Sequence, residues 1–167
     1  MTKMDFALAI LRIATGASIA YHGYNKVWGA GGLAGTASWF AGIGMKFPQM
    51  QARVAAFTEI GAGLLLVFGL FTVPASAALI ALMIVAIVTV HWKVGYFIFL
   101  PNGGWEYCAS LVITGTVIGL LGAGSISLDD QIGMADMTGG WAVLFGVGAA
   151  VCHLTLTYRP LHNNSEF

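Results

Sequence analysis

The chain consists of five long apolar stretches separated by short polar or aromatic segments. A membrane-spanning helix needs about 20 mainly apolar residues, and each stretch approaches that length. The pattern therefore predicts five membrane helices at approximately residues 6–24, 52–71, 74–92, 105–123 and 138–158. We expect the first four to form the core of the bundle, and the last to be an additional C-terminal helix.

The connecting segments also carry structural information. Thr72-Val73-Pro74 predicts a very tight turn, because proline suits the first turn of the helix that follows. Residues 25–51 contain several aromatic side chains and predict a short interfacial helix or a re-entrant turn. Residues 93–104 are aromatic and interrupted by glycine and proline, which is typical of an interfacial loop.

Composition agrees with a membrane location. Only 8% of the residues are charged, against roughly 25% in a soluble domain, and 58% are hydrophobic. A compact domain of 167 residues would leave much of that apolar surface exposed. A net charge of zero also provides no basic patch for nucleic acid. We therefore expect an all-α integral membrane bundle, a single domain over residues 1–167, with the lipid bilayer as its first partner.

The distribution of Lys and Arg predicts an orientation. With five helices, one side of the membrane carries Lys3, and the other carries Lys26, Lys46, Arg53, Lys93 and Arg159. Cytoplasmic loops are enriched in these residues, so we expect the second side, with the C-terminus, to face the cytoplasm and the N-terminus to lie outside. The expected location is the inner (cell) membrane.

Most polar side chains within or next to the helices fall in one leaflet, and the opposite half is expected to be nearly featureless. Ionisable groups are costly in a bilayer and usually face a cavity or one another. One-sided clustering therefore predicts a ligand-binding or functional site. The candidate residues are His22, Lys26, Glu59, His91, Asn102 and Glu106.

Two charged residues have a structural alternative. Arg12 lies about 15 Å from His22 along a helix and is expected to be a structural residue that reaches toward Glu59 as an ion-pair partner. Glu59 itself reads equally well as a buried partner of Arg12 or Arg53 that fixes helix packing. Both readings stay open on the sequence alone.

A metal site is not predicted. Histidine and glutamate occur together in one leaflet, but no His-x-x-x-His, Glu-x-x-His or Cys-x-x-Cys-His spacing is present, and each ligand would come from a different helix. Cys108 and Cys152 are interpreted as small apolar residues. His153 and His162 are assigned no special role.

Several motifs, taken together and in order, resemble the DoxX family. They are His22-Gly-Tyr-Asn-Lys26, the segment Glu59–Thr72 with its glycines, His91, Asn102-Gly-Gly-Trp-Glu106, and Gly122–Asp129. The resemblance covers about residues 5–130 and implies a four-helix bacterial membrane protein that serves as a subunit of a membrane oxidoreductase complex. The stretch 138–158 departs from the four-helix pattern.

Three functions follow as hypotheses. The first is a membrane subunit of a redox complex that binds a quinone, without a covalent cofactor, near His22, Glu59, His91 and Glu106, where histidine and carboxylate can exchange protons with the quinone oxygens. Electrons would come from another membrane-protein subunit, because the sequence shows no haem, flavin or iron–sulfur motif. The second is a non-catalytic anchor or assembly subunit, alone or as a homo-oligomer. The third, less favoured, is a small-molecule transporter.

Overall fold

The computed structural model describes residues 1–135 and 140–160, and the helices fall within these ranges. They are α1 (Lys3–Trp28), α2 (Gly32–Gly42), α3 (Pro48–Phe68), α4 (Thr72–Ala86), the π-helical turn η1 (Ile87–His91), α5 (Glu106–Leu121), α6 (Leu128–Gln131) and α7 (Trp141–Thr157). The predicted helical membrane bundle is confirmed. The predicted first residues of the last helix, 138–139, lie outside the described residues, as does His162.

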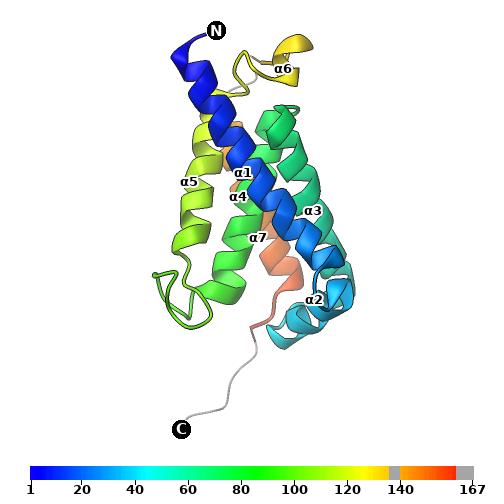
Figure 1. Cartoon of the computed structure of the whole chain (residues 1–167). Coiled ribbons are helices and arrows are strands. Elements are labelled where there is room, and N and C mark those ends of the chain that lie inside the picture. The colour runs from blue at the N-terminus through cyan, green and yellow to red at the C-terminus, as the bar shows by residue number, and fades with distance from the viewer. Residues whose placement is uncertain (136–139, 161–167) are drawn as a thin grey trace.

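Long helices run side by side between the two ends of the bundle (Figure 1). In the described residues, three segments are long and apolar enough to cross a membrane, namely Lys3–Trp28, Pro48–Phe68 and Thr72–His91. Helices α5 and α7 are apolar but shorter. Large apolar side chains such as Ile10, Ile113 and Leu144 are more than 60% exposed on the bundle surface, as expected for contact with lipid.

The bundle has two distinct ends, which we call the α6 end and the α2 end. The N-terminus and α6 lie at the first, and α2, the loop 92–105 and the end of α7 lie at the second (Figure 1). At the α2 end, backbone bonds join Lys46 to Thr157 and Arg159 to Gly44. The more basic side of the orientation prediction, with Lys26, Lys46, Arg53, Lys93 and Arg159, corresponds to this end. The orientation itself stays a prediction.

The turn between the second and third long helices differs from the prediction. Helix α3 ends at Phe68, Gly69 adopts a left-handed conformation with φ +62°, and α4 begins at Thr72. The turn is therefore formed by residues 69–71. Residues 72–74 already form the first turn of α4. Proline is suited to this turn, because it has no N–H group and the first N–H groups of a helix have no intrahelical acceptor.

Glycines bring α1 and α3 into close contact. A Cβ atom on Gly63 of α3 would lie 2.6 Å from the carbonyl oxygen of Gly16, and one on Gly23 of α1 would lie 2.6 Å from the carbonyl oxygen of Ala56. Small residues let membrane helices approach at backbone distance, where van der Waals contact holds them together. On the other side of the bundle, Gly119 of α5 packs against Ala142 of α7.

Replacing Gly63 tests this packing. Gly63→Ala should destabilise the protein by about 1–3 kcal/mol, because the added methyl group meets backbone atoms that cannot move aside. Gly61→Ala on the same helix is the matched control, since a Cβ there meets nothing within 4 Å and alanine favours the helix. Thermal unfolding in detergent measures both. Equal stability of the two variants would contradict the packing account.

Candidate functional site

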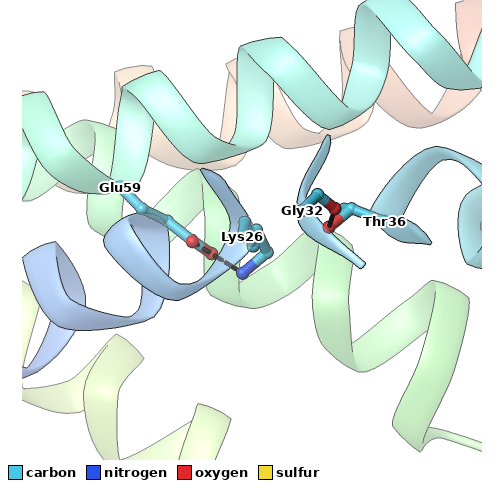
Figure 2. Close-up of polar contacts among 4 residues, drawn as sticks. All are labelled: Lys26, Gly32, Thr36 and Glu59. Carbon is cyan, nitrogen blue, oxygen red and sulfur yellow. Dashed lines mark hydrogen bonds and ion pairs between the residues drawn. The ribbon is translucent and has the colours of Figure 1, made fainter. Parts of the chain in front are cut away.

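Helices α1 and α3 place an ion pair inside the bundle. The Nζ atom of Lys26 donates to both carboxylate oxygens of Glu59, at 2.8 Å and 2.6 Å (Figure 2). The side chains are only 20% and 9% exposed. Close packing of Gly23 on α3 next to this pair gives the two side chains their short separation. In residues 1–135 and 140–160 no other ion pair is found.

The pair lines a chamber of about 310 Å³ at the α2 end of the bundle. Four of the predicted site residues line it: His22, Lys26, Glu59 and His91. The remaining walls are mainly apolar and aromatic, and include Trp39, Phe40, Met83, Tyr107 and Cys108. Few polar groups in an apolar cavity are typical of small-molecule sites.

His91 enters this chamber from a widened helical turn. The segment 87–91 forms a π-helix, closed by the bond from the Trp92 amide to the Ile87 carbonyl at 2.7 Å. Such turns are frequent at functional sites. The Nδ1 atom of His91 lies 2.7 Å from the carbonyl oxygen of Gly103, and because a carbonyl only accepts, Nδ1 donates. The neutral ring then keeps Nε2 as a free acceptor.

Tyr107 joins α5 to the same site, although the sequence analysis assigned it no role. Its hydroxyl lies 3.0 Å from the Ser18 hydroxyl on α1, and its ring is 6.2 Å from the His22 ring, centroid to centroid. The signal for it was its position directly after Glu106 in a predicted site motif.

Asn102 and Glu106 do not line the chamber. The Oε2 atom of Glu106 accepts a bond from the Ile98 amide at 3.1 Å, and Asn102 is exposed with φ +71°. Further backbone bonds, from Trp105 to Gly95 and from Glu106 to Tyr96, close the same loop. Both residues therefore shape the loop that presents Gly103 to His91.

The predicted ion pair of Arg12 is wrong. Arg12 is 1% exposed, and its guanidinium donates to the carbonyl oxygens of Leu66, at 3.0 Å, and of Ile126. The reason is depth: Arg12 lies near the α6 end, whereas Glu59 pairs with Lys26 toward the α2 end. A guanidinium carries five donors. Backbone carbonyls accept from the two terminal nitrogens of Arg12, whereas its buried Nε has no hydrogen-bond partner among the described residues.

The sequence analysis expected this half of the bundle to be nearly featureless. The structure shows instead that the α6 end contains buried polar residues. Asp129 is 3% exposed, and its carboxylate accepts bonds from the amides of Phe71 and Thr72, at 2.8 Å and 2.9 Å, which caps α4. Its own amide donates to Gly69 at 2.9 Å. Residues 69–72, at the end of the motif Glu59–Thr72, therefore meet the motif Gly122–Asp129 in one polar cluster. This cluster holds α3, α4 and α6 together.

The described residues contain no group of three or more His, Cys, Asp and Glu side chains arranged to hold a metal ion. Both cysteines are free: Cys108 is buried in the chamber wall, and Cys152 is exposed on α7. The groups that the chamber offers a ligand are therefore hydrogen-bond donors and acceptors together with aromatic surface.

The sequence of the chain is similar to those of known membrane proteins of one family. The sequence model of the DoxX family matches residues 7–92, just over half of the chain. The chain is also 32% identical over 127 residues to a Bacillus subtilis (strain 168) protein named "Putative oxidoreductase CatD", covering 76% of this chain and 87% of that protein. No solved structure matches. The chain belongs to the DoxX family, and the matched region contains His22, Lys26, Glu59 and His91.

The polar cluster at the α6 end gives a stability prediction. Asp129→Asn should lower the free energy of unfolding by about 2 kcal/mol, because the amide has one acceptor oxygen for two backbone donors. Asp130→Asn is the control and should change it by less than about 0.5 kcal/mol, since that side chain is exposed. Denaturant titration in detergent micelles measures both. A similar loss in the two variants would refute the role of Asp129.

Proposed function

We propose that this DoxX family protein is a membrane subunit of a redox system and that its chamber binds the ring of a quinone. The observation that supports the proposal most directly is the hydrogen bonding of the Lys26 ammonium group. Its ammonium group has three donors, and two of them are directed to Glu59. The third is available to a carbonyl oxygen in a cavity whose remaining walls are mainly apolar and aromatic.

The other walls fit the same ligand class. A quinone is flat and apolar apart from its carbonyl oxygens, and Trp39, Phe40 and Tyr107 supply aromatic surface for it. His91 Nε2 can accept a proton from the hydroquinone or, once protonated, donate one to the quinone. The pairing with Glu59 offsets the cost of the Lys26 side chain in this setting, because an unpaired ammonium group is costly in a bilayer.

Redox chemistry requires a partner in this proposal. Reduction of a quinone to the hydroquinone takes two electrons and two protons. Lys26 and His91 can exchange protons, and the electrons come from a partner protein that carries a redox cofactor. The oxidoreductase name of the Bacillus subtilis relative supports a redox role for the family.

A non-catalytic anchor is the second candidate, and one observation favours it. The loop at the α2 end exposes several large apolar side chains, with Phe97 50%, Ile98 51% and Phe99 77% exposed. Such a surface suits contact with another membrane protein. In this case the Lys26–Glu59 pair would only fix the packing of α1 on α3.

Glu59→Gln distinguishes the candidates. The neutral amide removes the charge that holds the Lys26 ammonium, so we expect quinone affinity to fall at least tenfold, which is about 1.4 kcal/mol. Quenching of tryptophan fluorescence by a water-soluble short-chain quinone measures it in the purified protein. Glu106→Gln is the matched control, because it keeps an acceptor for the loop and lies outside the chamber.

The two outcomes point to different functions. Loss of affinity in Glu59→Gln alone, with its thermal unfolding still cooperative, supports quinone binding. Equal affinity in both variants and in the wild-type protein would reject it and leave the anchor function, for which co-purification of a stoichiometric partner is the expected result.

A further inference from the structure

An apolar groove lies directly beside the chamber. It has a volume of about 260 Å³ and is formed by α3, α4 and α7 together with Phe40 and Met45. Both α3 and α7 pack on α4, and they make little contact with each other. The groove follows this gap and is partly open to lipid, since Val54 on its wall is 47% exposed.

The groove and the chamber share walls. Phe40, Met45, Ala55, Leu82 and Val85 line both, so the two spaces are separated only by side chains that touch each of them. Ligand pockets typically measure about 300–1,000 Å³, and the chamber lies at the lower limit of that range. A chamber of this size accommodates the ring of a ligand. A longer substituent on the ring must then extend outside the chamber.

The lining of the groove changes with depth in the bilayer. Two of its polar residues, Gln51 and His153, lie near the start of α3 and the end of α7, at the α2 end, and the third, Thr58, lies in the middle of α3. Its deeper wall is formed by Ala78, Ala81 and Ala149. Ala78 precedes His91 by 13 residues, about 20 Å along the helix, so the groove extends past the middle of the segment Thr72–His91.

We infer that the ligand of the chamber is an amphiphile with one linear apolar chain, an isoprenoid or alkyl tail, and that this tail lies in the groove between α3, α4 and α7. The inference rests on the proposed function, because the ring must occupy the chamber for the tail to enter the groove beside it. Small alanine side chains line the deep part of the groove, and its open side at Val54 lets a chain enter from lipid.

The test compares a ring without a tail and the same ring with an isoprenoid tail, using the full-length protein in nanodiscs of defined phospholipid. Ala81→Leu adds volume to the deep part of the groove, at a residue that does not line the chamber. Ala14→Leu is the matched control, because Ala14 is exposed on α1 and lines neither space.

In the wild-type protein and in Ala14→Leu, the tailed quinone should bind more tightly than the tailless one. Ala81→Leu should weaken binding of the tailed quinone about tenfold, the size of change expected from one overpacked side chain, and leave the tailless quinone unchanged. That combination supports the inference.

Other results overturn it in distinguishable ways. If the tailless ring binds normally but Ala81→Leu does not affect the tailed quinone, the groove holds a phospholipid acyl chain or nothing, and quinone binding in the chamber stands. If Ala81→Leu weakens both ligands equally, the groove has no separate role. If neither quinone binds to the wild-type protein, the proposed function and the tail site fail together.

Discussion

A charged side chain inside a bilayer must find a partner within the protein, and at the α2 end of this bundle the contact between Lys26 and Glu59 meets that requirement. The pair joins α1 to α3 across the chamber and leaves one ammonium donor for a ligand. It depends on the close approach of the two helices, which Gly16, Gly23 and Gly63 permit. Packing and candidate chemistry are therefore linked through the same pair of helices.

The two ends of the bundle use polar residues differently. At the α6 end, Arg12 and Asp129 are almost fully buried and bind backbone groups at helix ends, which is a structural role. At the α2 end, the charged pair and His91 border a cavity that shares walls with a lipid-facing groove. This division explains why motif residues occur at both ends although only one end has a chamber.

The sequence predicted the helices and much of the site, because apolar length and the spacing of polar residues are local properties. Four of the six predicted residues line one chamber. The partner of Arg12 could not be predicted, because its acceptors are backbone carbonyls from distant segments. The loop role of Glu106 depends likewise on how residues 92–105 fold, which helical periodicity does not encode.

A double-mutant comparison of Lys26→Met and Glu59→Met tests the central claim, that the pair serves a ligand as well as packing. Each single variant should lose about 3–5 kcal/mol of stability, because it leaves a buried charge unpaired, and the double variant should recover most of that loss. The account predicts that the stable double variant no longer binds a quinone. A double variant that recovers both stability and quinone binding would contradict it.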